Sequence, residues 1–410
     1  MRSDMRNLYY DVVIAGCGVA GLYAALNLPE EMSVLMLSKE DLESCDSMLA
    51  QGGICVLRDE EDYDSYFEDT MRAGHYENRK ESVDIMIRSS RDVINDLLNF
   101  GVRFAKNPDG SLAYTREGAH SRPRICFHED ITGKEITTTL LSHVKKCSNV
   151  TILEYTTMTD ILVDGGKCTG MVAETKEGET LHIHANNTIM ATGGIGGLYE
   201  HSTNFPILTG DACRIAEKHG VELEHMDYVQ IHPTCLYSKK PGRSFLISES
   251  ARGEGAILLN HKGERFVNEL LPRDVVTKAI QEEMKKEGVE HEWISFAHVP
   301  KEIILKHFPH IYERCLEEGY DLLKEPAPIV PAQHYFMGGV HVDRDSMTTM
   351  PRLYAAGETS CNGVHGKNRL ASNSLLESLV FAKRAAIKIQ NEEKGNKDHE
   401  FESNYHAACC

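Results

Sequence analysis

Short runs of apolar residues near the start of the chain predict buried strands of a parallel sheet. Residues 11–15 form the first run and residues 34–37 the second. Runs of this length without polar alternation are typical of strands covered on both faces. A glycine-rich turn and an apolar helical stretch, residues 22–26, lie between them. The pattern predicts a β-α-β unit within about 30 residues.

From residue 150 the pattern changes to short strands separated by turn residues. Turns such as Asp164-Gly165-Gly166 and Lys176-Glu177-Gly178 favour antiparallel hairpins. We expect a β-meander that leads into a buried strand ending at Gly193-Gly194. The expected strands are residues 151–155, 160–163, 168–175, 179–185 and, as the last buried one, 188–192.

Residues 226–336 mix short strands and helices without a β-α-β rhythm. A buried-strand signal returns at residues 353–356, and a helix is expected from about Ser374 to Gln390, where Ser374 and Glu377 have capping-box spacing. The expected fold is therefore α/β: a Rossmann-type FAD-binding domain with a β-meander, interrupted by an inserted α+β capping domain. The expected boundaries are 1–225 and 337–395 for the first domain, 226–336 for the second, and 396–410 for a polar tail.

Charge limits the partners of this chain. Its 44 Lys and Arg against 62 Asp and Glu give a net charge of −18, which opposes nucleic acid and anionic membrane partners. A small anionic substrate would need a local group of cationic side chains. The sequence has no run approaching the roughly 18 apolar residues of a membrane span and no secretory signal, so we expect a cytoplasmic protein.

The 12 cysteines are scattered, without a CxxC pair or zinc spacing. They predict reduced thiols and neither a metal site nor a disulfide framework.

Three glycines after the first strand form a dinucleotide fingerprint. Gly16 makes the tight turn, Gly18 lets the backbone approach a pyrophosphate, and Gly21 allows close helix–strand packing. The phosphates would then lie at a helix N-terminus. The second strand ends in Ser38-Lys39 with Glu40 just beyond, so the ribose contact stays open.

Further glycine-rich strand ends indicate a long cofactor across the carboxyl edge of the sheet. A helix that starts at Asn373-Ser374, shortly after Glu358, would stabilise negative charge on a reduced flavin ring. This favours FAD over NAD. The glycine-rich segments are Ala50-Gln51-Gly52-Gly53, Ala191-Thr192-Gly193-Gly194 and Ala356-Gly357-Glu358.

Several polar segments combine arginine and histidine. Each alone has an ordinary structural explanation, but two arginines and two histidines together would form the cationic pocket that a dicarboxylate needs. The segments are Thr115-Arg116-Glu117-Gly118, His232-Pro233-Thr234, Ser248-Glu249-Ser250-Ala251-Arg252-Gly253-Glu254-Gly255, Pro272-Arg273-Asp274, His334-Tyr335 and His365-Gly366-Lys367-Asn368-Arg369.

Together, these motifs resemble the succinate dehydrogenase and fumarate reductase flavoprotein superfamily. The motifs occur in the family's order from about residue 10 to 390. Within the family, the chain is most similar to the L-aspartate oxidase branch. Two features favour that branch: Glu117 in Thr-Arg-Glu-Gly, and Cys45 to Leu49 where the dehydrogenases carry a flavin-linking histidine. The motifs are Ala50 to Gly53, Ala191 to Gly194, Arg252 to Gly255, Pro272 to Asp274 and His365 to Leu375.

The resemblance implies site residues. Arg273 and Glu117 would be catalytic, Arg273 by proton transfer and Glu117 by distinguishing the ammonium of aspartate from a methylene. His232, Ser248, His334 and Arg369 would bind the substrate carboxylates. FAD, held noncovalently, would contact Gly16, Cys17, Gly18, Val19, Ala20, Gly21, Lys39, Asp46, Ser47, Met48, Leu49, Ala50, Gln51, Gly52, Gly53, Asp211, Glu358, Ser374 and Leu375.

The implied reaction is oxidation of L-aspartate to iminoaspartate, the first step of de novo NAD synthesis. Hydride would pass to flavin N5, fumarate or O2 would reoxidise the flavin, and quinolinate synthase would consume the product. Because arginine normally stays protonated, Arg273 has an equally sound electrostatic role. The family usually continues into a C-terminal helical domain, whereas this chain ends soon after the Ser374 helix. Two alternatives remain: a soluble fumarate reductase or succinate dehydrogenase, and a flavin-binding protein without turnover.

Overall fold

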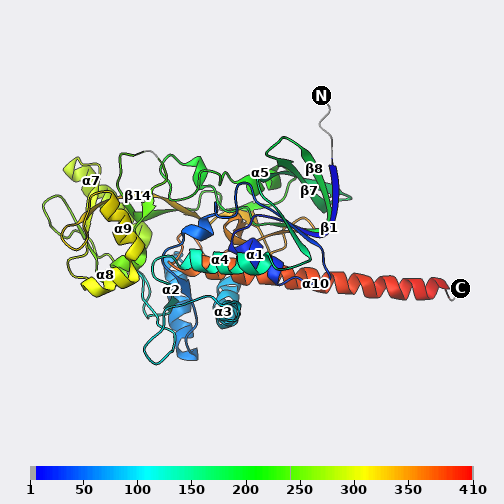
Figure 1. Cartoon of the computed structure of the whole chain (residues 1–410), viewed down its shortest axis with the longest axis horizontal. Helices are drawn as coiled ribbons and strands as arrows, with labels where there is room; N and C mark the ends of the chain where they lie inside the picture. Colours follow the sequence, from blue (N-terminus) through cyan, green and yellow to red (C-terminus); the bar gives the residue numbers. More distant parts are fainter. Residues whose placement is uncertain (1–5, 241, 409–410) are drawn as a thin grey trace.

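A seven-stranded mixed sheet is the largest sheet in the computed structural model, which describes residues 6–240 and 242–408, and Figure 1 shows its strands β1, β7 and β8 toward one end of the folded body. The strand order is β5-β2-β1-β8-β7-β6, and β16 pairs with β8. The strands β5, β2, β1, β8 and β16 are parallel, while β6, β7 and β8 form the antiparallel meander. The bounds are β1 (Arg6–Ala15), β2 (Val34–Leu37), β5 (Val150–Leu153), β6 (Thr156–Asp164), β7 (Lys167–Thr175), β8 (Thr180–Met190) and β16 (Leu353–Ala355).

The structure corrects two strand predictions. Residues 151–155 were expected in the meander, but β5 pairs in parallel with β2 at the sheet edge. Residues 179–185 and 188–192 were expected as separate strands, but β8 is continuous as far as Met190. It stays extended because β1 pairs along its whole length, while β7 pairs with its first half and β16 with its second.

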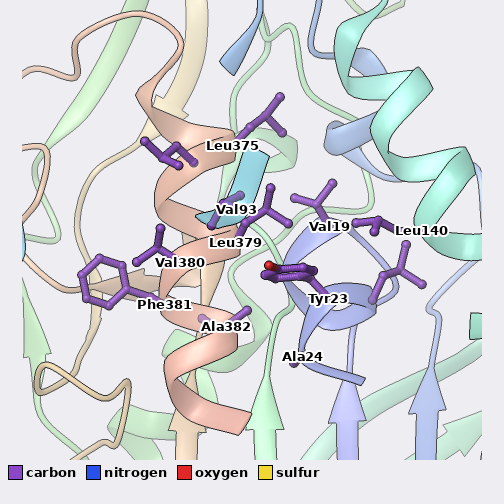
Figure 2. Packing of buried hydrophobic residues seen from close by; sticks show 14 of the residues in the cluster. Val19, Tyr23, Ala24, Val93, Leu140, Leu375, Leu379, Val380, Phe381 and Ala382 are labelled. Carbon is purple, nitrogen blue, oxygen red and sulfur yellow. The ribbon is translucent and has the colours of Figure 1, made fainter. Parts of the chain in front are cut away.

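A helical layer packs against the parallel part of this sheet. Figure 2 shows Val19 and Tyr23 of α1, Leu140 of α4 and Leu379 of α10 gathered in one apolar cluster. The sequence predicted helices at α1 and at the start of α10, and it gave no prediction for α2, α3 and α4. The bounds are α1 (Val19–Leu26), α2 (Tyr63–Ala73), α3 (Lys80–Phe100), α4 (Thr132–Val144) and α10 (Asn373–Ala408). Helix α5 (Asp211–Lys218) packs in a separate apolar cluster.

A second sheet lies at the other end of the molecule, with its own apolar cluster (Figure 1). Its strand order is β11-β10-β14-β13-β12. All its strands fall within residues 226–336, the segment expected to form the cap. The bounds are β10 (Val229–Leu236), β11 (Phe245–Leu246), α6 (Glu249–Gly253), β12 (Ile257–Leu259), α7 (Arg273–Glu287), β13 (Glu292–Ser295), α8 (Lys301–His307), α9 (Pro309–Glu317) and β14 (Ala327–Phe336).

The long helix α10 and five short strands complete the description of the chain. Helix α10 continues from Asn373 to Ala408, well past the expected end at Gln390, and its far end projects from the rest of the molecule in Figure 1. The expected polar tail, 396–410, is therefore helical as far as Ala408, and its last two residues lie outside the described part. No described helix has the length and apolar character needed to cross a membrane. The remaining short strands are β3 (Ile54–Cys55), β4 (Ile125–Cys126), β9 (Leu223–Glu224), β15 (Gly339–His341) and β17 (Ser360–Cys361).

Candidate active site

One continuous cavity runs from the glycine turn after β1 to the sheet of the capping segment. Residues at the carboxyl ends of β1, β2 and β14 line it, and its wall brings together motifs far apart in sequence. Residues from both predicted sites line it, including Gly16, Lys39, Gly52, Asp211, Glu358 and Leu375 from the cofactor set and Glu117, Ser248, Arg273, His334 and Arg369 from the substrate set.

The glycine turn leaves no room for side chains. Gly16 has φ +119°, and a Cβ there would lie 2.0 Å from the Ala191 carbonyl oxygen. A Cβ on Gly21 would lie 2.0 Å from the Gly16 carbonyl oxygen. Helix α1 begins directly after Gly18 with no acidic residue in its first turn. A close backbone approach to a helix N-terminus fits a pyrophosphate, so this end of the cavity fits FAD.

Lys39 and Asp211, both predicted to contact the cofactor, contact each other. Lys39 Nζ lies 2.8 Å from Asp211 Oδ2 and also donates to the Ile207 carbonyl and to Thr209 Oγ1. Lys39 follows β2, where a dinucleotide ribose contact is usually found. The pair therefore offers both a cationic and an acidic group at that position.

Two buried carboxyl groups lie farther along the cavity. Asp46 accepts from the Phe205 amide at 2.9 Å, and its Oδ2 has no hydrogen-bond partner among the described residues. Glu358 accepts from the Phe336 amide at 2.9 Å. Burial raises the pKa of Asp46 to about 7, and burial with the nearby Asp46 charge raises the pKa of Glu358 to about 8. A carboxyl that keeps its proton can donate to oxygens of a bound cofactor.

Most of the predicted cofactor residues line this cavity, but Gly21 and Met48 do not. Gly21 packs beneath the Gly16 turn, and the Met48 sulfur accepts from Thr138 Oγ1 at 3.8 Å. Their contact with FAD therefore stays a prediction, as do the contacts of the residues that line the wall: Gly16, Cys17, Gly18, Val19, Ala20, Lys39, Asp46, Ser47, Leu49, Ala50, Gln51, Gly52, Gly53, Asp211, Glu358, Ser374 and Leu375.

Two guanidinium groups face the substrate end. Arg273, the first residue of α7, donates from Nε to Glu249 Oε2 at 2.7 Å and from Nη1 to Gln230 Oε1 at 2.9 Å. Arg369 donates to Ser374 Oγ at 3.0 Å, while its buried Nε has no partner in the described chain. Burial and the charge of Arg273 lower the pKa of Arg369 to about 10, so it stays cationic at neutral pH. Such a pair suits carboxylate ligands.

Two histidines complete this end of the cavity. The His232 Nδ1 accepts from the Thr234 amide at 3.1 Å, which places the ring proton on Nε2. That buried Nε2 has no hydrogen-bond partner in the part of the chain that the structure describes. His334 lies 5.1 Å away between ring centroids, with Nδ1 2.6 Å from Thr203 Oγ1. Burial and Arg273 lower the pKa of both rings, so both are neutral donors. His232 is packed behind the wall, whereas His334 and Ser248 line it.

Glu117 lines the same cavity as Arg273 and Arg369, and both of its carboxylate oxygens accept hydrogen bonds. Oε1 accepts from Ser250 Oγ and Oε2 from Ser372 Oγ, each at 2.6 Å. A Cβ on Gly52 would lie 2.3 Å from Oε1, so the glycine leaves space for the carboxylate. Burial raises the pKa of Glu117, and the two serine hydroxyls partly counter that effect. The carboxylate is therefore fixed at the cavity wall.

The sequence motifs indicated no role for Glu249 and Gln230, the two residues that hold Arg273. Glu249 contacts Arg252 and Arg273, each at 2.7 Å, and all three are buried. Burial alone would raise the pKa of Glu249, but the two arginines hold it below its ordinary value. The i, i+3 spacing of Glu249 and Arg252 was visible in the sequence. Gln230 had no such signal, because it reaches Arg273 across 43 residues of chain.

A dinucleotide cradle that opens into a buried dicarboxylate pocket defines a flavoprotein of the succinate dehydrogenase and fumarate reductase type. Residues 11–375 match the FAD binding domain family. Two curated relatives are L-aspartate oxidases: one from Clostridium perfringens, 52% identical over 93% of this chain and 87% of the relative, and one from Clostridium acetobutylicum, 48% identical over 94% and 89%. The chain belongs to the L-aspartate oxidase family.

Solved structures agree with this fold. A quinol–fumarate reductase with menaquinol molecules matches with a TM-score of 0.88 at 32% identity, over 94% of this chain and 72% of that one. A single-residue variant of the E. coli quinol fumarate reductase matches with a TM-score of 0.87 at 31% identity, over 94% and 71%. The predicted α/β fold and FAD as cofactor are thereby confirmed.

Proposed function

We propose that this chain oxidises L-aspartate to iminoaspartate with FAD as its cofactor. The observation that carries the proposal is Glu117, a buried carboxylate that lines the same cavity as Arg273 and Arg369. The two arginines suit the two carboxylates that aspartate shares with succinate. Glu117 suits the ammonium group, which succinate lacks. The names of the curated relatives support the same substrate.

The chain binds and orients the substrate. Arg369 has an unused Nε donor for one carboxylate, and Ser248 and His334 line the same cavity. His232 does not line the cavity, and its Nε2 lies 3.8 Å from Glu249 Oε2, so its contact with the substrate stays a prediction. Arg273 has Nη2 available for the other, because Glu249 and Gln230 hold its remaining nitrogens. Glu117 draws the ammonium toward one wall, which fixes the face presented by the α-carbon. FAD, when bound, supplies the acceptor for the hydride that leaves that carbon.

Two roles for Arg273 fit this arrangement. Its contact with Glu249 stabilises the charged guanidinium, which favours a purely electrostatic role in gripping a carboxylate. Its position at the cavity wall also suits transfer of the proton that the substrate amine releases. We propose that Arg273 has the second role in addition to gripping a carboxylate, and separate measurements of binding and turnover test it.

The segment 226–336 would act as a cap over this cavity. It supplies Ser248, Arg273 and His334, while the remaining segments supply Glu117 and Arg369. Closing these two groups of residues around aspartate would align the reacting atoms and exclude water. The division into an FAD domain, 1–225 and 337–395, and a cap follows from this proposal.

The cellular context is part of the proposal. An imine hydrolyses readily in water, so prompt use by quinolinate synthase in NAD synthesis would protect the product. The similarity to fumarate reductases supports fumarate as an electron acceptor, and O2 is the other acceptor we propose. The cytoplasm is the proposed location.

Because Cys45 to Leu49 include no histidine, FAD would be noncovalent and released by denaturation.

Anaerobic mixing of the yellow protein with L-aspartate tests the proposal. Loss of oxidised-flavin absorbance with aspartate and not with succinate is the expected result. The variant Glu117→Gln should lose most of this preference, because an amide carries no charge for the ammonium. Bleaching by succinate alone would instead identify a succinate dehydrogenase type of enzyme. Protein that holds FAD and bleaches with neither would be a flavin-binding protein without turnover.

A further inference from the structure

A fully buried arginine, Arg124, lies outside the lining of the cavity. Arg124 donates to Asp62 at 2.8 and 3.1 Å and to Asp69 at 2.8 Å, and none of its side chain is exposed. Burying a guanidinium is costly unless its donors are satisfied. The Arg124 guanidinium does not line the cavity, so substrate binding does not explain the free-energy cost of burying it.

Arg124 fixes the ring of His120. It donates from Nη1 to His120 Nδ1 at 2.9 Å, so the ring proton is on Nε2. Nε2 then donates to the Ala371 carbonyl at 2.9 Å. Burial and the Arg124 charge lower the pKa of His120 to about 4, so the ring stays neutral and keeps this orientation. The arginine therefore sets the direction of a donor aimed at the turn before α10.

That turn is strained and heavily supported. Ser372 has φ 62°, a left-handed conformation that a residue with a side chain rarely adopts. The Cys55 amide donates to its carbonyl at 3.1 Å. Asn373, the next residue, is held by Tyr66 and Thr70 of α2, at 2.8 and 3.2 Å. Strain of this kind persists only where the surroundings impose it.

The strained turn delivers one hydroxyl to the substrate site. Ser372 Oγ donates to Glu117 Oε2 at 2.6 Å. His120 also reaches Glu117 directly, because its amide donates to the Glu117 carbonyl at 3.3 Å across a turn with Ala119 at φ 65°. His120 thus contacts the main chain of Glu117 on one side and supports its carboxylate, through Ser372, on the other.

We propose that His120, oriented by Arg124, is a positioning residue for amine recognition, because it holds the Ser372 turn that aims the Glu117 carboxylate. This inference rests on the proposed function, since it assumes that Glu117 binds the substrate ammonium. Without the Ser372 hydrogen bond the Glu117 carboxylate is held by Ser250 alone. A less firmly oriented carboxylate loses affinity for an ammonium and leaves the carboxylate-binding arginines unaffected. The defect of a His120 variant should therefore be confined to ligands that carry an amine.

Two dissociation constants separate this role from general support of the fold. L-aspartate and succinate are compared by calorimetry on protein whose bound FAD has been chemically reduced, so that neither ligand turns over. The two ligands differ only in the amine. In His120→Leu the dissociation constant for aspartate should rise about tenfold or more, the range for a hydrogen bond to a charged group. The dissociation constant for succinate in His120→Leu should change by less than about twofold. His120→Gln, which keeps a donor beside an acceptor, should recover much of the affinity.

A double variant tests the route through Ser372. Ser372→Gly removes the hydroxyl and accepts φ 62° without strain, so it should weaken aspartate binding as His120→Leu does. If His120 acts through this hydroxyl, adding His120→Leu to Ser372→Gly should cause little further loss. Losses that multiply in the double variant would overturn the proposal. Equal weakening of both ligands, unchanged aspartate binding, or loss of FAD in folded His120→Leu would overturn it as well.

Two controls keep the outcome interpretable. If His120→Leu does not fold, His120→Asn, whose shorter side chain reaches Arg124 and not the Ala371 carbonyl, replaces it under the same criteria. Failure of the unaltered protein to bleach with aspartate would refute the proposed function, and that result is obtained before any variant is made.

Discussion

Gly52 lies against the carboxylate of Glu117, and a Cβ at residue 52 would stand 2.3 Å from Oε1. The same Cβ would lie 3.3 Å from Ser372 Oγ. The second glycine-rich motif therefore has a function besides its place beside the cofactor. It leaves the space that a buried acidic side chain occupies at the substrate end of the cavity.

Substitution Gly52→Ala should displace Glu117 without unfolding the chain, because the obstructed atom is the end of a flexible side chain. We expect KM for aspartate to rise about tenfold, as for loss of a hydrogen bond to a charged group, with a small change in thermal midpoint. Steady-state kinetics and thermal unfolding measure the two effects. Gly395→Ala, where a Cβ meets nothing within 4 Å, is the control. An unchanged KM in Gly52→Ala would show that the position of the Glu117 carboxylate does not affect aspartate binding.

The variant Arg273→Lys should impair turnover more than binding. Two of the three guanidinium nitrogens hold Glu249 and Gln230, so one remains for substrate, and lysine cannot reproduce that fork. We expect kcat to fall about a hundredfold or more, as when a transition-state donor is removed, and the dissociation constant for succinate to rise about tenfold or less. Stopped-flow kinetics and calorimetry give the two values. Equal losses would favour the purely electrostatic role of Arg273.

Stability of the FAD-free protein should fall as pH rises from about 5 to 8. Burial and Asp46 raise the pKa of Glu358 to about 8, whereas its ordinary value is 4.5. Between these values the folded chain keeps a proton that the unfolded chain has released, so rising pH favours unfolding. Thermal midpoints across this range should drop less in Glu358→Gln than in the unaltered protein. Exposed Glu31→Gln should leave the slope as it was, and a slope unaffected by Glu358→Gln would contradict the assignment.

Truncation of Phe381 should destabilise the helical layer. This side chain is fully buried on α10, and Figure 2 shows it beside Val380. Phe381→Ala should lower the free energy of unfolding by about 3–5 kcal/mol, the usual range for a buried phenylalanine. Ile387→Ala, at a position on the same helix that is 44% exposed, should cost far less. Urea denaturation of the FAD-free proteins compares them, and similar losses would place Phe381 at the surface.

Local patterns in the sequence predicted the parallel strands β2 and β16, whereas β5 was wrongly assigned to the meander. Residues 34–37 form β2 as expected, because a short apolar run between turns has few alternatives. The merged strand β8 was missed because its continuity depends on partners that are distant in the chain. Helices α2 and α3 carry no chemical motif and drew no prediction, although their buried positions recur with helical spacing.

The site was predicted where residues lie in recognisable motifs, and missed where they support those motifs from elsewhere. Arg273 and Arg369 were named from the sequence and face one cavity. Glu249, Gln230 and His120 were not assigned, because their contacts join positions far apart in the chain. Such pairings are properties of the folded structure and leave no local pattern.

The two serines that hold Glu117 belong to different parts of the chain. Ser250 comes from α6 in the capping segment, and Ser372 precedes α10. The environment of this carboxylate is therefore completed only while the two parts are together. Under the proposed role of Glu117, discrimination between an amino acid and a plain dicarboxylate is a property of the assembled state, and an open molecule would admit both ligands alike.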